Sequence, residues 1–136
     1  MRVLITGGSG LVGRNLRAHP RDQAHNILAP SSNELNMLDS AATTATVAAM
    51  APDLIINAAG RVGGIQANMA QPVEFLVDNA DMGRNILIAA KSARIPRVLN
   101  IWSSCMYPRD AENPLCEDQI GTVSYTHLTL PTILLV

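Results

Sequence analysis

Short apolar runs alternate with stretches of helical periodicity along most of the chain. The run Val3–Ile5 is rich in β-branched residues and stops at glycines, which is typical of a buried strand that enters a tight turn. From Leu11 the apolar residues take helical spacing until Pro20 ends the pattern. Asn26–Ala29 predicts a second strand and Leu35–Leu38 a short third one, with turn-forming residues between them.

The alternation continues through the second half. Asp39 or Ser40 can cap an alanine-rich helix. A fourth strand, a long helix and a fifth strand are then predicted over Asp53–Asn57, Pro72–Ala93 and Arg97–Trp102. Strands that alternate with helices predict parallel pairing through right-handed crossovers. The predicted fold class is therefore α/β, with a doubly wound parallel sheet.

Composition narrows the class of protein. The chain has 136 residues, 48% of them hydrophobic, which suits one globular domain or part of one. Ten basic residues oppose 11 acidic ones, so we expect neither nucleic acid nor an acidic membrane surface as a partner. The apolar runs near both ends are short, so we expect neither a signal peptide nor a membrane-spanning helix. Cys105 and Cys116 form no CxxC motif and no histidine has metal-ligand spacing, so we expect a cytoplasmic protein without a metal.

The segment between the first strand and the first helix reads TGGSGLVG. Glycines at 7, 10 and 13 permit a sharp turn, close approach of the backbone to a pyrophosphate, and close packing of helix on strand. Free amides at the helix start can then hold the phosphates. We predict a Rossmann-type dinucleotide site that includes Gly7, Gly8, Ser9, Gly10, Leu11, Val12 and Gly13.

The end of the second strand bears on the choice of cofactor. An acidic residue there would hold the 2′-hydroxyl of NAD, but this chain has Ala29-Pro30-Ser31-Ser32. Ser31, Ser32 and Arg14 could donate to a 2′-phosphate, which favours NADP, although both serines could equally be turn residues. Asp39 could accept from the adenine amino group or only cap its helix.

The last predicted strand runs into Ser103-Ser104-Cys105. Ligands of open parallel sheets bind beyond the carboxyl ends of the strands, so these side chains are candidates for the substrate side of the site. Adjacent serines also form ordinary loops, and a cysteine at a strand end can be a small buried residue.

Four segments together resemble the extended short-chain dehydrogenase/reductase family, and within it the GDP-L-fucose synthases. They are GGSGLVG, NELNMLDS, RVGGIQANMAQPVEFLVDN and SSCMYP. The resemblance covers about Met1–Glu117 and implies a truncated NAD(P)-binding Rossmann domain, residues 1–120, without its substrate domain. It implies NADPH as cofactor and conversion of the nucleotide sugar GDP-4-keto-6-deoxy-mannose to GDP-L-fucose, by epimerisation and then reduction. It also implies a homodimer built on the long helix.

The resemblance assigns roles to individual residues. Ser103 would hydrogen-bond the keto oxygen and Cys105 would exchange the protons. Further cofactor contacts would come from the ends of the other strands, the long helix and the last strand, namely Leu38, Asp39, Ala58, Ala59, Gly60, Asn79, Ile101, Trp102, Ser103 and Ser104.

The chain departs from the family at its reductive acid. No tyrosine is followed four residues later by a lysine: Tyr125 has Thr129 there, and Lys91, the single lysine, lies in the long helix. We therefore expect the chain by itself to be inactive. Segment 121–136 contains no acidic residue, lysine or arginine, and we interpret it as a tail foreign to the family. Two alternatives stay open: another nucleotide-sugar epimerase or dehydratase, and a non-catalytic dinucleotide-binding module.

Overall fold

The computed structural model describes residues 1–19, 24–103, 107–108 and 111–120. The chain divides into two compact units, Met1–Ile101 and Trp102–Val136. The first unit contains a four-stranded sheet in the order β2-β1-β3-β4, and every pairing is parallel. Its strands are β1 (Arg2–Thr6), β2 (Asn26–Leu28), β3 (Leu54–Asn57) and β4 (Val98–Asn100). The α/β class with a parallel sheet is thus confirmed.

The strand order places a topological switch point beside β1. From β1 the chain moves first to β2 on one side and then to β3 on the other. Leu4 pairs with both Leu28 and Ile55, and Thr6 pairs with Asn57. The carboxyl ends of β1 and β3 therefore lie next to each other, which is where open α/β sheets bind ligands.

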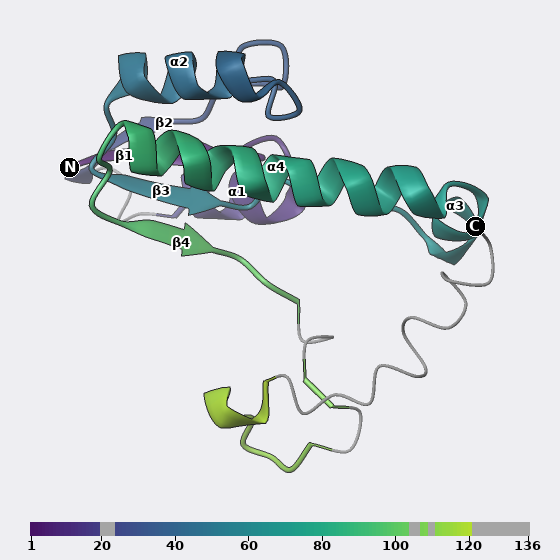
Figure 1. Ribbon diagram of the computed structural model, residues 1–136. Coiled ribbons are helices and arrows are strands. Elements are labelled where there is room, and N and C mark those ends of the chain that lie inside the picture. The colour runs from purple at the N-terminus through teal and green to yellow at the C-terminus, as the bar shows by residue number, and fades with distance from the viewer. Residues whose placement is uncertain (20–23, 104–106, 109–110, 121–136) are drawn as a thin grey trace. The chain divides into compact units, whose positions relative to one another are not determined.

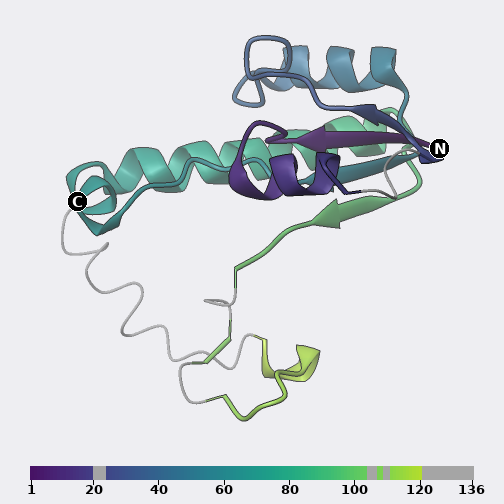
Figure 2. The ribbon, with the colours of Figure 1, turned by 180° about the vertical axis from the view of Figure 1, so that it is seen from behind.

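Helices lie on both faces of this sheet, as Figures 1 and 2 show from opposite sides. Helix α1 (Leu11–Arg17) lies on one face, and α4 (Pro72–Ser92) on the other, where α2 (Ser40–Met50) packs beside it. A short helix, α3 (Ile65–Ala70), precedes α4. The first half of α4 extends past the carboxyl ends of β1 and β3 (Figure 1).

The core forms between the sheet and the pair α2 and α4. Leu4 and Ile55 contribute from the strands, Val47 from α2 and Ile86 from α4, and all four are fully buried. Because side chains of a strand alternate between faces, the buried Val3 and Ile5 point to the opposite side from Leu4. Burial on both faces explains why the apolar run of β1 is continuous.

The predicted strand over Leu35–Leu38 is wrong. This segment is a loop of turns, in which Leu35 and Met37 are buried in the core while Asn36 and Leu38 are exposed. Alternate burial is also the pattern of a strand, but within the described part of the chain this segment pairs with no neighbouring strand. Its Met37 carbonyl instead accepts from the side-chain Nδ2 of Asn85, on α4, at 2.8 Å. Packing by α4 thus replaces pairing with a neighbouring strand.

The start of α2 agrees with the sequence. Asp39 is its N-cap, and its carboxylate accepts from the backbone N–H of Ala42 at 3.0 Å. Helix α4 also begins at Pro72, a residue that suits the first helical turn. The strand predicted over Arg97–Trp102 is shorter, Val98–Asn100, and α3 was not predicted.

The second unit contains one described helical turn, the 3-10 helix Glu117–Gln119.

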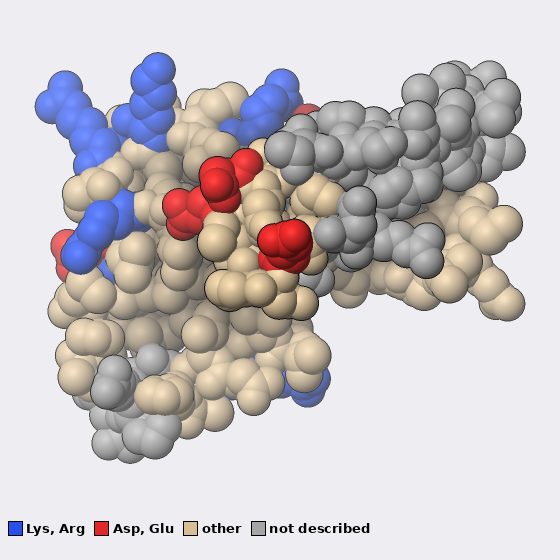
Figure 3. Space-filling model, turned by 90° about the horizontal axis from the view of Figure 1, so that it is seen from below, with Lys and Arg blue, Asp and Glu red and all other residues tan. Residues whose placement is uncertain are grey.

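Acidic and basic side chains form small separate groups among uncharged residues on the face drawn in Figure 3. Within the described ranges, no helix is long and apolar enough to cross a membrane. The same residues include no group of three or more histidine, cysteine or acidic side chains placed to hold a metal ion.

Candidate functional site

The glycine-rich turn between β1 and α1 has a conformation that only glycine tolerates. Gly7 has a φ of 67°, in the left-handed region, and a Cβ there would lie 2.6 Å from the Ala58 carbonyl oxygen. A Cβ on Gly13 would lie 2.3 Å from the Gly7 carbonyl oxygen. The first glycine therefore makes the turn, and the third lets α1 pack on it.

The start of α1 is open to a ligand. Its N-cap is Gly10, which has no side chain to cap the helix, and the following Leu11 and Val12 are exposed. The first amides of a helix have no partner within it, so a bound anion can accept from them. A cofactor pyrophosphate could accept from these amides, because the N-cap Gly10 has no side chain that would occupy them.

The loop after β3 lies directly against the glycine turn. The backbone of Ala58 and Ala59 surrounds the position that a Gly7 side chain would take, within 2.8 Å of its Cβ. The Ala59 N–H also donates to the Thr6 Oγ1 at 3.3 Å. Two predicted cofactor segments, Gly7–Gly13 and Ala58–Gly60, are thus brought together at the carboxyl ends of β1 and β3.

A row of polar side chains crosses the sheet beneath these loops. The buried Thr6 hydroxyl donates to the Asn57 Oδ1 at 2.6 Å, and the Asn57 Nδ2 donates to the Asn100 Oδ1 at 2.8 Å. Each residue ends its strand, so the row ties the ends of β1, β3 and β4 together. The sequence prediction missed this row. Its signal is a polar residue at the end of each apolar run, at Thr6, Asn57 and Asn100.

Two further predicted cofactor residues lie in the segment that follows β2 along the chain. Leu38 and Asp39 are exposed in the loop before α2. The Ser31 hydroxyl and N–H both donate to the Glu34 Oε2 at 2.8 Å, and these bonds lower the pKa of Glu34. Glu34, two residues beyond the Ala29–Ser32 segment, thus already accepts from the Ser31 donors that we expected a 2′-phosphate to use.

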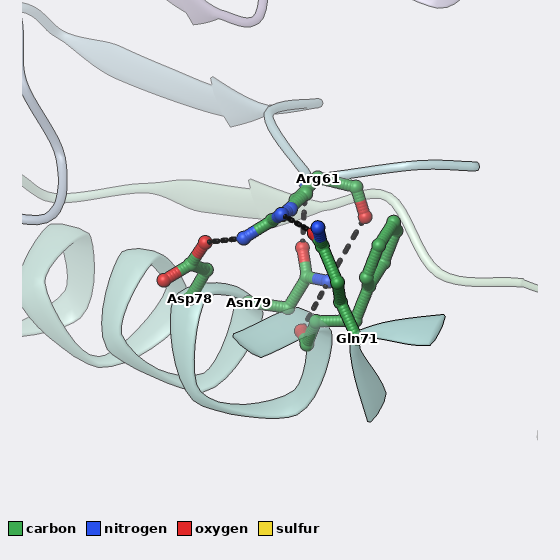
Figure 4. Close-up of polar contacts among 5 residues, drawn as sticks. Arg61, Gln71, Asp78 and Asn79 are labelled. Carbon is green, nitrogen blue, oxygen red and sulfur yellow. Dashed lines mark hydrogen bonds and ion pairs between the residues drawn. The ribbon is translucent and has the colours of Figure 1, made fainter. Parts of the chain in front are cut away.

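Arg61 anchors the loop that follows Gly60 to helix α4 (Figure 4). Its guanidinium forms an ion pair with the Asp78 carboxylate at 2.6 Å, donates to Gln71 Oε1 and lies 4.7 Å from the centre of the Phe75 ring. Asn79 accepts from the Arg61 N–H at 2.8 Å and donates to the Arg61 carbonyl at 3.0 Å. The predicted site residue Asn79 thus binds the backbone of the loop.

The structure describes only some of the residues predicted for the substrate side of the site. The exposed Ile101 follows β4 and donates its N–H to the Asn57 carbonyl at 3.0 Å. Trp102 and Ser103 belong to the second compact unit. Ser104 and Cys105 lie outside the described residues. The assignments of these five residues remain predictions.

Comparison with known proteins gives a family match. The model of the NAD dependent epimerase/dehydratase family matches residues 3–129. The chain is 47% identical over 122 residues to the GDP-L-colitose synthase of Yersinia pseudotuberculosis, covering 90% of this chain and 40% of that protein. It is 42% identical over 119 residues to the GDP-L-fucose synthase of Azorhizobium caulinodans, covering 88% of this chain and 38% of that protein.

A solved structure shows the same fold. The GDP-L-fucose synthetase of Naegleria fowleri, in a crystal structure bound to NADP, superposes with a TM-score of 0.74 at 23% identity, over 90% of this chain and 36% of that one. The chain therefore spans about two fifths of the length of the relatives that it matches.

Proposed function

Because the chain belongs to the NAD dependent epimerase/dehydratase family, we propose that it is the cofactor-binding part of an NADP-dependent epimerase-reductase acting on a GDP-linked 4-keto sugar. The observation that carries the proposal is the contact of Gly7 with the Ala58 backbone, which joins two cofactor segments at the switch point. The motif RVGGIQANMAQPVEFLVDN, at Arg61–Asn79, supports the GDP-sugar branch of the family.

The proposed reaction converts GDP-4-keto-6-deoxy-mannose to GDP-L-fucose. The carbons next to a ketone are acidic, so a base and an acid can exchange their protons before hydride reduces the ketone. NADPH supplies that hydride when it is bound. Ser103 is proposed to hold the keto oxygen and Cys105 to exchange protons. The chain has no Tyr-x-x-x-Lys pair, so we expect it to bind NADPH without turnover.

A second candidate is the synthesis of GDP-L-colitose. It is favoured by the 47% identity to the Yersinia GDP-L-colitose synthase, against 42% to the Azorhizobium GDP-L-fucose synthase. The two candidates share the cofactor site and differ in the sugar. A competition experiment can separate them: the GDP-sugar that protects Cys105 from alkylation at the lower concentration, in the presence of NADP, is the better ligand.

We also propose a homodimer that uses helix α4. Its outward residues Val73, Leu76 and Val77 are exposed, and an apolar face of this kind is a liability unless another surface covers it. Sedimentation of the chain over a range of concentrations tests this; a monomer at every concentration would contradict it.

Calorimetric titration of the 136-residue chain with NADPH tests the cofactor site. We expect saturable binding of one NADPH per chain, weaker binding of NADH, and loss of binding in Gly7→Ala, whose new Cβ would meet the Ala58 carbonyl. Gly83→Ala is the matched control, because a Cβ at Gly83 has no neighbour within 4 Å. A folded parent chain that does not bind NADPH would refute the proposal.

A further inference from the structure

Asn79 uses its whole side-chain amide to hold other parts of the chain. Its Nδ2 donates to the carbonyls of Arg61 at 3.0 Å and Phe75 at 2.7 Å, so both amide hydrogens are engaged. Its Oδ1 accepts from the Arg61 N–H at 2.8 Å. The side chain therefore pairs with the backbone of Arg61 on both sides, as a neighbouring strand would.

The Arg61 side chain reinforces this attachment from above the same helix (Figure 4). The Arg61 side chain is 35% exposed and the Asp78 side chain 26%, so their ion pair at 2.6 Å is partly shielded from water. Gln71 and Phe75 give the guanidinium a further acceptor and an aromatic face. Arginine suits this arrangement, because its planar fork can bond two acceptors and stack on a ring at once.

The loop held in this way touches the glycine turn. Arg61 directly follows Gly60, and a Cβ at Gly60 would lie 3.3 Å from the Asn79 Oδ1, so the loop is close to α4 there as well. Three residues before Arg61, the Ala58 backbone packs on Gly7. A movement of Arg61 away from α4 would therefore be transmitted over a few backbone bonds to the cofactor site.

We propose that Arg61 and Asn79 are positioning residues, which clamp the Ala58–Gly60 loop to helix α4 and thereby hold it against the glycine turn for NADPH. The proposal rests on the proposed function and deepens it. In it Asn79 acts through the loop, because both hydrogens of its amide are already donated. The first half of α4, which extends past the strands, serves as the support (Figure 1).

The test compares Arg61→Gln and Arg61→Lys in the full chain. Arg84→Gln is the matched control, because it breaks an ion pair of α4, Arg84 with Asp81 at 3.2 Å, that does not involve the loop. Two quantities are measured: hydrogen exchange of the backbone amides of residues 59–61 without ligand, and the Kd of NADPH by calorimetry. Thermal unfolding of each variant shows whether the whole unit is destabilised.

We expect Arg61→Gln to speed exchange of the loop amides about tenfold and to raise the Kd of NADPH by a similar factor, as for loss of one hydrogen bond to a charged group. Arg61→Lys keeps the charge beside Asp78 but not the planar fork. Its loop exchange rate and its Kd for NADPH should therefore lie between those of the parent chain and of Arg61→Gln. Arg84→Gln should change neither.

The outcomes separate the clamp from the cofactor. Loop exchange that stays at the parent rate in Arg61→Gln overturns the clamp, whether or not NADPH binds. Faster exchange with an unchanged Kd overturns its role in cofactor positioning. A parent chain that binds no NADPH refutes the proposed function and the positioning role with it, while the exchange rates still decide whether the clamp exists.

Discussion

Gly13→Ala provides the most direct test of the glycine turn as a packing device. Gly13 is a buried residue inside α1, and in an unhindered helix replacement of glycine by alanine stabilises by about 1 kcal/mol. Here the new Cβ would lie 2.3 Å from the Gly7 carbonyl oxygen and 2.6 Å from the Gly8 Cα. Both neighbours are backbone atoms, so no flexible side chain can move aside.

The size of the effect follows from these distances. To widen the 2.3 Å approach to 3.0 Å, α1 must move away from the turn by about 0.7 Å. Overpacking of this kind costs about 1–3 kcal/mol, occasionally more, against the gain in helix propensity. The difference between this cost and the gain is a net loss of about 1 kcal/mol in the free energy of unfolding, which lowers Tm by about 4 °C in a domain of this size.

The assay is thermal unfolding followed by far-ultraviolet circular dichroism, with Gly83→Ala measured in parallel. Gly83 also lies inside a helix, but its Cβ position is open. Its replacement should therefore raise the free energy of unfolding by about 1 kcal/mol. The packing role of Gly13 is refuted if Gly13→Ala raises Tm as Gly83→Ala does.

Substitutions at three further positions test other contacts by urea unfolding. Asp39→Ala removes the N-cap of α2 and should cost about 1 kcal/mol, whereas Asp39→Ser should cost less; equal losses would contradict the capping role. Hydrogen bonds from Ser31 lower the pKa of Glu34, so its contribution to stability is present above the ordinary glutamate pKa near 4.5 and is lost as pH falls through the lowered value. Glu34→Gln should therefore lose less stability than the parent on acidification below that pH; identical pH profiles would be inconsistent with this bond. Thr6→Val leaves the buried Asn57 Oδ1 without its donor and should cost about 1–3 kcal/mol, while Thr6→Ser should retain most of the stability; a neutral Thr6→Val would show that the polar row is dispensable.

Local patterns sufficed where neighbouring residues decide the structure. The glycine spacing predicted the turn between β1 and α1, because the allowed backbone angles of Gly7 and the packing of Gly13 depend on atoms a few residues away. Asp39 predicted the start of α2 in the same way, since its carboxylate binds an amide three residues on.

The misplaced strand over Leu35–Leu38 shows the limit of periodicity. Alternate burial of Leu35 and Met37 satisfies a strand pattern equally well in a loop, and the choice depends on whether a neighbouring strand is available. In this protein Asn85, about fifty positions away in the sequence, binds the Met37 carbonyl instead.

The sequence by itself determined the class of fold, the glycine turn and the caps, because these follow from short-range sterics and the order of apolar runs. Tertiary structure alone decided which distant polar groups meet: Thr6 with Asn57 across the sheet, and Arg61 with Asp78 and Asn79 on α4. Hydrogen bonds and ion pairs act over a few ångströms. Their partners are therefore set by how the strands and helices pack, and no spacing along the chain specifies them.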